Sequence, residues 1–152
     1  MPNASSPEAM QTVDALVQAA RTLPGARPDR VGLFGHSRGA GATLNYILGA
    51  GHVQAAVLNS GGYPNELADR AGQVKAPILI LHGKADGPAD GGSALTSVQM
   101  ARDFEAALRR AGKPVEAMYY EGSGHNGIFT SPTQYDDEVK RIVAFLRRCL
   151  RN

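Results

Sequence analysis

The strongest chemical signal in the sequence is a serine between two glycines. Residues 35–39 read Gly-His-Ser-Arg-Gly, after a short apolar run that ends at Phe34 and before an apolar stretch over 40–48. A G-x-S-x-G pattern between a strand and a helix places its serine at a sharp corner above the end of a sheet. We expect neighbouring backbone at this corner to leave no space for a Cβ at Gly35 or Gly39. The corner is also a helix N-terminus, which favours negative charge. We therefore interpret Ser37 as a nucleophile and the Arg38 backbone N–H as an oxyanion donor.

Two later motifs supply a base and an acid in the order that this chemistry needs. Asp86 lies in the motif His-Gly-Lys-Ala-Asp, directly after the apolar run 76–81. His125 ends the motif Gly-Ser-Gly-His, after the run 115–120. Because ligands bind at the carboxyl ends of parallel strands, we expect these side chains to meet Ser37 at one edge of a sheet. His125 would take the serine proton and return it to the leaving group, and Asp86 would orient the imidazole.

Other polar residues near these motifs have competing interpretations. Asp90 is an alternative acid in the same loop, but Asp86 lies nearer the strand end, where it is better fixed. His36 either lines the pocket or packs beneath the turn, and we favour packing. His82 is expected to orient the acid loop, and His52 to lie in solvent. The four histidines lack metal-ligand spacing, so no metal site is expected. The candidate substrate-binding residues are His36, Asn59, Tyr63 and Ile128.

Apolar periodicity predicts an α/β fold with a mainly parallel sheet of about four strands flanked by helices. The expected strands are 31–34, 53–59, 76–81 and 115–120. The expected helices are 7–22, 37–48, 94–112, and one from Pro132 onward, with one short helix within 65–74. We expect a single domain over 1–152, in which 1–5 is a loose lead-in.

Composition narrows the classes of partner. The chain has 152 residues, 43% hydrophobic and 20% charged, with a net charge of +2, which is too small to predict a nucleic-acid partner. No apolar run is long enough to span a membrane and no signal peptide is visible, so we expect no membrane association and a cytoplasmic location by default. The one cysteine, Cys149, has no partner for an intramolecular disulfide and is expected in the core.

Taken together, the three motifs resemble those of the α/β-hydrolases, nearest to the dienelactone-hydrolase-like and related serine esterase branch. The stretch 106–116 is similar to the one that those proteins carry between acid and histidine, and the resemblance covers Val31 to the C-terminus. It implies hydrolysis of a carboxylic ester or similar acyl bond through an acyl-enzyme, without a metal or cofactor. Dienelactone hydrolases proper carry a cysteine nucleophile, so Ser37 indicates a general esterase for small or solvent-accessible esters.

The chain also departs from what the resemblance implies. Members of that family have several strands before the nucleophile strand, and here only one predicted helix precedes it, which gives a minimal core lacking the N-terminal strands. The loop that supplies the second oxyanion donor is missing with them. Strand 31–34 becomes an exposed edge, so we expect a homodimer or larger homo-oligomer that buries it. A non-catalytic fragment acting as an association module is the alternative, and a peptidase is less favoured because no large cap is present.

Overall fold

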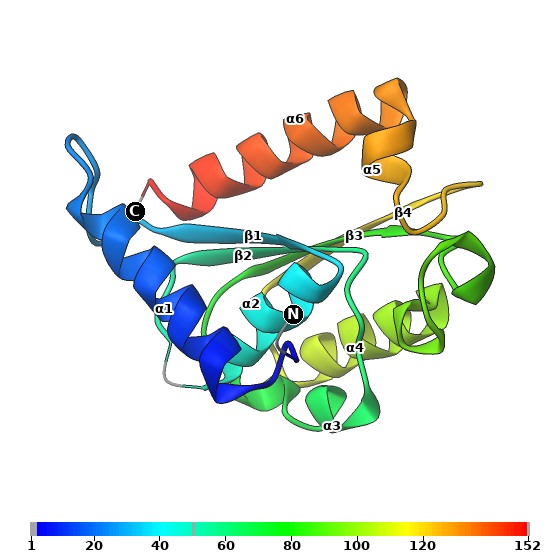
Figure 1. The fold of residues 1–152 in the computed structure, drawn as a ribbon, viewed down its shortest axis with the longest axis horizontal. Coiled ribbons are helices and arrows are strands. Elements are labelled where there is room, and N and C mark those ends of the chain that lie inside the picture. The colour runs from blue at the N-terminus through cyan, green and yellow to red at the C-terminus, as the bar shows by residue number, and fades with distance from the viewer. Residues whose placement is uncertain (1–2, 50, 152) are drawn as a thin grey trace.

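Four parallel strands form one sheet in the order β1-β2-β3-β4 (Figure 1). The computed structural model describes residues 3–49 and 51–151. The strands are β1 (Gly32–His36), β2 (Ala55–Asn59), β3 (Ile78–Gly83) and β4 (Val115–Tyr120). The predicted fold class, an α/β fold with a parallel sheet of four strands, is confirmed.

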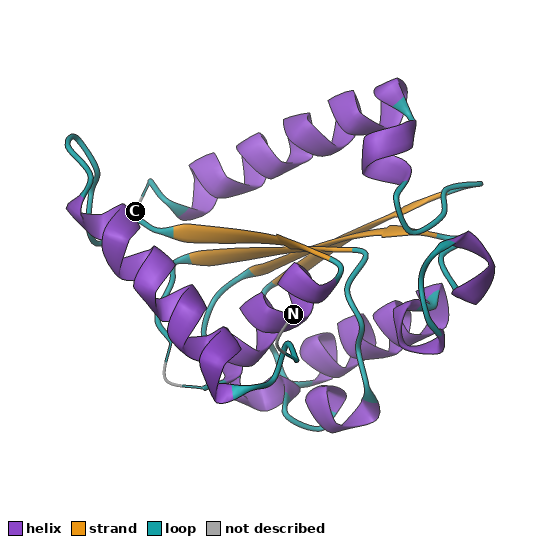
Figure 2. Ribbon diagram, in the orientation of Figure 1, coloured by secondary structure: helices purple, strands orange, loops and turns teal. Residues whose placement is uncertain are grey.

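Helices cover both faces of this sheet (Figure 2). The α-helices are α1 (Pro7–Thr22), α2 (Arg38–Leu48), α3 (Asn65–Ala68), α4 (Val98–Arg110), α5 (Gly127–Thr130) and α6 (Pro132–Cys149). Three short 3₁₀ turns are η1 (Ala71–Gln73), η2 (Pro88–Asp90) and η3 (Ala94–Thr96). Helices α1, α2 and α4 lie on one face, and α6 crosses the other (Figure 1). None of the helices in the described part of the chain is both long and apolar enough to cross a membrane.

The two central strands are buried on both faces, which explains their continuous apolar sequences. Successive side chains of β2 alternate between two clusters. Ala56 and Leu58 pack in the larger cluster with α2 and α4, whereas Ala55 and Val57 pack under α6 around Phe145. This burial fixes the register of the sheet and therefore the positions of the loops at its carboxyl edge.

Some element boundaries differ from the sequence-based expectations. The predicted helix 94–112 is divided at Ser97, which is extended (φ −61°, ψ 147°) and whose hydroxyl accepts a hydrogen bond from the Met100 amide. The segment 65–74 holds α3 and η1 rather than one helix, and the short α5 lies in a stretch expected to be loop. Strand β3 continues through Gly83, two residues beyond its apolar run.

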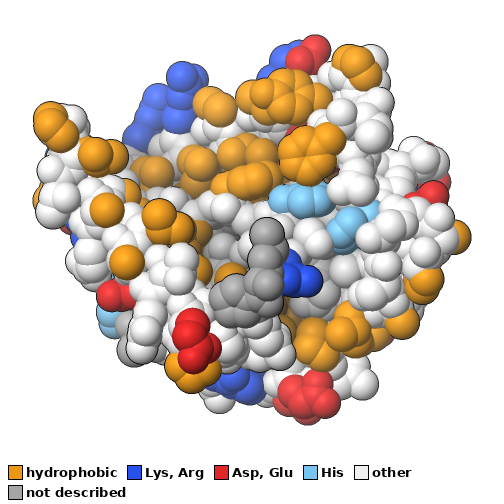
Figure 3. All heavy atoms as spheres, viewed as in Figure 1, with side chains coloured by type: hydrophobic (Ala, Val, Ile, Leu, Met, Phe, Trp, Pro, Cys, Tyr) orange, Lys and Arg blue, Asp and Glu red, His pale blue; other side chains and the backbone are white. Residues whose placement is uncertain are grey.

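Strand β1 is the outermost strand on its side of the described sheet. Phe34 on β1 is 45% exposed. On helix α6, Val139 and Val143 are 36% and 39% exposed. Figure 3 shows a band of hydrophobic side chains between α6 and α1, with histidine side chains at one end of the band. The sheet face under α6 is therefore only partly covered near β1.

Candidate active site

The turn between β1 and α2 holds Ser37 in an unusual backbone conformation. Its φ is 54° and its ψ is −117°, values that a residue other than glycine adopts only at a cost. The Ser37 amide donates to the Asn59 carbonyl oxygen at 2.9 Å, which ties the turn to β2. A Cβ at Gly35 would lie 2.6 Å from the Ala40 backbone nitrogen, so the tightness expected there is confirmed. The same expectation for Gly39 is wrong, because nothing lies within 4 Å of where its Cβ would be.

Ser37, His125 and Asp86 form one hydrogen-bonded series. The Ser37 Oγ lies 2.8 Å from His125 Nε2, and His125 Nδ1 lies 3.0 and 3.1 Å from the two carboxylate oxygens of Asp86. Each residue comes from a loop or turn directly after a strand, namely β1, β4 and β3. Both His125 and Asp86 are buried. In this geometry Nδ1 donates to the carboxylate, and Nε2 can accept the serine proton.

The carboxylate of Asp86 has two further polar neighbours. The Thr96 hydroxyl donates to Asp86 Oδ1 at 2.8 Å, and His82 Nε2 lies 3.4 Å from Oδ2. Asp90, the alternative acid, is exposed on η2 and has no such contact with His125 in the part of the chain that the structure describes. Thr96 escaped the sequence analysis because it lies in a separate segment, ten positions after Asp86, with no motif around it.

His82 is a buried neutral support for the acid loop. Its Nε2 lies 2.6 Å from the Thr96 carbonyl oxygen, so Nε2 carries the proton and donates. Burial lowers the pKa of His82, against the opposing effects of the Thr96 carbonyl and the Asp86 carboxylate. Its Nδ1 is buried and has no partner among the described residues. Protonation there would place an unsatisfied donor in the core, so His82 holds the Thr96 segment beside Asp86 without carrying charge.

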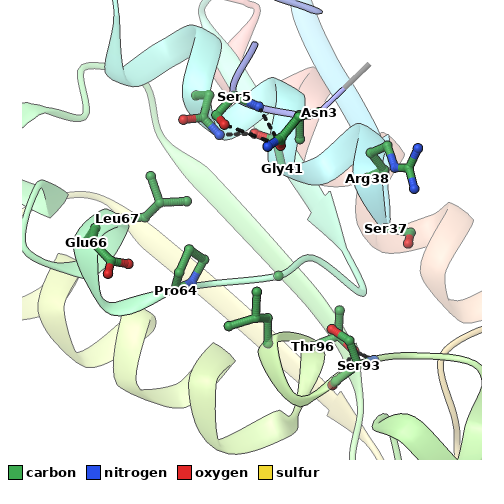
Figure 4. A pocket seen from close by; sticks show the side chains of 14 residues that line it. Asn3, Ser5, Ser37, Arg38, Gly41, Pro64, Glu66, Leu67, Ser93 and Thr96 are labelled. Carbon is green, nitrogen blue, oxygen red and sulfur yellow. Dashed lines mark hydrogen bonds between the residues drawn. The ribbon is translucent and has the colours of Figure 1, made fainter. Parts of the chain in front are cut away.

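A cleft of about 730 Å³ opens beside Ser37 (Figure 4). Ser37 and Arg38 lie at one end of the cleft and Glu66 and Leu67 lie at the other. Its lining residues are Asn3, Ala4, Ser5, Ser37, Arg38, Gly41, Asn45, Gly62, Pro64, Glu66, Leu67, Ser93, Leu95 and Thr96. This volume is within the range of small-molecule sites.

The four residues expected to bind substrate lie outside the lining of this cleft. Tyr63 is 1% exposed and its ring stacks on Phe104, with centroids 5.0 Å apart, because its place after β2 turns it into the core. Ile128 is buried on α5 and lines a separate surface hollow. Asn59 is buried, and His36 contacts it under the turn. For His36 this is the packing arrangement that the sequence analysis favoured over pocket lining.

A second polar network lies behind the turn, and the sequence analysis missed half of it. His36 Nδ1 lies 2.5 Å from Asn59 Oδ1, and Asn59 Nδ2 donates to Glu138 Oε2 at 2.6 Å. Gln134 Nε2 donates to the other Glu138 oxygen at 2.7 Å. Glu138 has 0% exposure, and burial raises the pKa of its carboxyl. Its spacing to Ile142 and Phe145 on α6 was the available signal, since it places the acid on the apolar face.

Comparisons with known proteins concern the family and the fold of the chain. A family model described as the dienelactone hydrolase family matches residues 2–145. The alpha/beta hydrolase domain-containing protein 17B of Xenopus laevis is 30% identical over an alignment 152 positions long, gaps included, which covers 87% of this chain and 48% of that protein. The chain thus spans about half the length of the curated relatives that it matches.

Solved structures of hydrolases share the fold. An acylaminoacyl peptidase of Pyrococcus horikoshii superposes with a TM-score of 0.83 at 17% identity, covering 100% of this chain and 29% of that one. The esterase Pf2001 of Pyrococcus furiosus superposes with a TM-score of 0.79 at 14% identity, covering 99% and 65%. At these identities the likeness concerns the fold alone. Because the family match extends over nearly all of its residues, the chain belongs to the dienelactone hydrolase family.

Proposed function

We propose that this chain is a serine hydrolase that cleaves carboxylic esters through an acyl-enzyme. The observation that carries the proposal is the continuous series from Ser37 Oγ to His125 Nε2 at 2.8 Å and from His125 Nδ1 to Asp86 at 3.0 Å. A serine hydroxyl needs such a base to attack a carbonyl at neutral pH, and the base needs a buried acid to fix its tautomer.

The reaction follows from these positions. Ser37 attacks the carbonyl carbon as His125 takes its proton, which gives a tetrahedral oxyanion. Arg38 is the first residue of α2, where backbone N–H groups have no intrahelical partner, and its amide donates to that oxyanion. His125 then protonates the leaving alcohol, and water repeats the sequence to release the acid. The second oxyanion donor is not assigned to a residue. If no group supplies it, we expect slow turnover, since losing one donor costs ~10²–10³ in rate.

The cleft favours small esters with an apolar group. Pro64, Leu67 and Leu95 contribute apolar surface to the cleft that Ser37 lines, and the exposed Glu66 also lines it. A short acyl chain fits such an open, mixed surface better than a long lipid chain, which needs continuous apolar cover.

Hydrolysis of p-nitrophenyl butyrate tests the proposal. We expect measurable turnover, its loss in Ser37→Ala, and a covalent adduct at Ser37 after treatment with a fluorophosphonate probe. Cleavage of a p-nitroanilide in preference to the ester would indicate a peptidase instead. A wild-type protein that turns over neither substrate and takes no label, with its circular dichroism intact, contradicts the hydrolase assignment.

We also propose that the open edge of β1 pairs with a second copy of the chain. Phe34 and the α6 residues Val139 and Val143 expose apolar area next to backbone groups of β1 that no described strand pairs. Association through this edge is the function expected of the chain if it proves inert as an enzyme.

A further inference from the structure

Glu138 is buried in a way that packing alone does not explain. It has 0% exposure on the face of α6 that covers the sheet. No Lys or Arg in the described part of the chain forms an ion pair with it. Burying a carboxylate without a cation is costly, and an apolar side chain of similar size would suit this face better. We therefore look for the role of Glu138 in the residues that it contacts.

Its contacts lead to the active site through a single amide. Glu138 accepts hydrogen bonds from Gln134 and Asn59, at 2.7 and 2.6 Å. Since the ionised carboxylate can only accept, it orients the Asn59 amide with Nδ2 toward itself and Oδ1 toward His36. His36 Nδ1 must then carry a proton and donate to Oδ1, at 2.5 Å. The chain of contacts sets both the tautomer and the plane of the His36 ring.

The His36 ring in turn packs against His125. Their centroids are 5.3 Å apart at an interplanar angle of 45°. On another side, the His36 ring meets Phe129 edge-on, with centroids 4.9 Å apart. His125 is carried by a loop that contains Gly122 and Gly124, so its backbone gives the imidazole little stiffness.

The contact between the His36 and His125 rings becomes important during the reaction. Once Ser37 is acylated, its oxygen no longer holds His125 Nε2, and the bond to Asp86 is the hydrogen bond that remains to the ring. The imidazole could then turn about that bond, away from the position where it must activate water. A neighbouring ring that is itself fixed restricts this rotation.

We propose that His36 is a positioning residue for His125, held in place by the buried series Gln134–Glu138–Asn59–His36. The proposal rests on the serine hydrolase function proposed above. It assigns no bond-making step to His36, which keeps the catalytic imidazole aligned between Ser37 and Asp86.

Kinetics of four variants test the proposal. Asn59→Leu and Glu138→Leu break the series with apolar residues suited to burial, and we expect kcat to fall about 10- to 100-fold with KM unchanged, as a small misplacement of a catalytic group does. In Glu138→Gln the amide oxygen still accepts from Asn59, and the NH₂ group can donate to Gln134 once that side-chain amide turns its oxygen toward it, so kcat should stay within about threefold of wild type. Asp136→Asn, an exposed acid on the same helix, is the matched control and should match wild type.

The coupling between the variants separates positioning from general damage. If one series acts, the double variant His36→Leu/Asn59→Leu loses no more kcat than the worse single variant, because residues acting as a unit are non-additive. Additive losses, or a kcat of Asn59→Leu equal to wild type while wild type turns over ester, overturn the positioning role and leave the hydrolase function standing.

A spectroscopic measurement decides the matter even if no turnover is found. Long-range ¹⁵N–¹H spectra of ¹⁵N-histidine-labelled protein report the tautomer of each ring. We expect a protonated Nδ1 on His36 and a sharp Nδ1–H signal from His125 in wild type. In Asn59→Leu the His36 pattern should change and the His125 signal should broaden. A His125 signal that is unchanged in Asn59→Leu overturns the inference.

Discussion

Replacing Asp86 by asparagine separates the charge of the acid from its geometry. Polar groups face both carboxylate oxygens: Thr96 donates to Oδ1, His82 Nε2 lies 3.4 Å from Oδ2, and His125 Nδ1 lies 3.1 Å from Oδ1 and 3.0 Å from Oδ2. The asparagine NH₂ group is best placed at the Oδ1 position, because the Thr96 hydroxyl can turn to donate to the Ser93 carbonyl, 3.0 Å away, and accept from the amide. The amide oxygen then still accepts from His125, so Asp86→Asn should retain the productive tautomer.

The expected loss in Asp86→Asn is therefore mainly electrostatic. The attack of Ser37 converts His125 into an imidazolium. With its Nδ1 at 3.0 and 3.1 Å from the carboxylate oxygens, the centre of the imidazolium charge lies about 4 Å from the centre of the Asp86 carboxylate charge. At an effective dielectric constant near 20, that pair is worth about 4 kcal/mol. Since about 1.4 kcal/mol corresponds to a tenfold rate, kcat should fall roughly 10³-fold.

A His125 with the wrong tautomer should lose more kcat than Asp86→Asn alone. We expect a double variant to produce that tautomer. In Asp86→Asn/Thr96→Val the amide has lost its acceptor at position 96, so its NH₂ group has no reason to avoid His125. We expect a loss of ~10⁴-fold, the size found when an asparagine imposes the wrong tautomer on a catalytic histidine.

Acylation by p-nitrophenyl butyrate under single-turnover conditions is the appropriate assay, with the rate of fluorophosphonate labelling as a second measure. Asp90→Asn is the matched control: its exposed carboxylate has no contact with His125 among the described residues, so its rate should stay within about twofold of wild type. A loss below tenfold in Asp86→Asn, or an equal loss in Asp90→Asn, refutes the assigned role of Asp86. Equal rates for Asp86→Asn and the double variant refute the argument about Thr96.

Three further predictions concern stability and association. Gly35→Ala should lower the free energy of unfolding by about 1–3 kcal/mol or more, because its Cβ would meet backbone. Gly39→Ala places its Cβ in open space on a helix and should raise the free energy of unfolding by about 0.5–1 kcal/mol. Urea unfolding measures both. Burial raises the pKa of Glu138 above 4.5, so the carboxyl stabilises the native state fully below pH 4.5, and this contribution is lost as pH rises through the raised value. Glu138→Gln should therefore gain stability relative to wild type as pH rises above 4.5. Phe34→Lys on the open edge should convert a wild-type dimer into a monomer in sedimentation experiments, with unchanged circular dichroism.

Each of these predictions has a contradicting outcome. Equal stabilities of the two glycine variants would show that the turn relaxes around a Cβ. A stability difference between Glu138→Gln and wild type that does not change with pH would mean that the acid titrates normally. A wild-type protein that is monomeric at micromolar concentration removes the dimer altogether.

The sequence predicted most of the fold because its signals are local. Helix α1 has the predicted bounds, 7–22, and the Ser6 hydroxyl accepts from the Ala9 amide as a cap should. Strand β4 has the predicted bounds, 115–120. The interruption at Ser97 was not predictable from periodicity, since an apolar stripe continues across the break and only the cap conformation ends the helix.

The surroundings of the site were predictable only in part. Strand order and motif order together indicated which side chains would meet. What the sequence did not show is the direction of side chains on short loops, as Tyr63 demonstrates by turning into the core. The partners Thr96 and Glu138 also escaped. A threonine in a turn has the same appearance as a solvent-exposed residue, and only its burial distinguishes it. Glu138 carries one signal, its helical spacing to the apolar residues Ile142 and Phe145, but its charge favours the exposed interpretation.

The position of β1 couples the mechanics of the sheet to its chemistry. An end strand is bonded along one side only, so it separates from the sheet at a lower free energy than an interior strand does. Here that strand ends in the strained Ser37 turn. A backbone hydrogen bond from the Ser37 amide to the Asn59 carbonyl oxygen joins this turn to the neighbouring strand. Whatever pairs with the free side of β1 raises the free energy of opening and stiffens the turn at the same time. Association and nucleophile alignment are then thermodynamically linked: each must strengthen the other by the same factor.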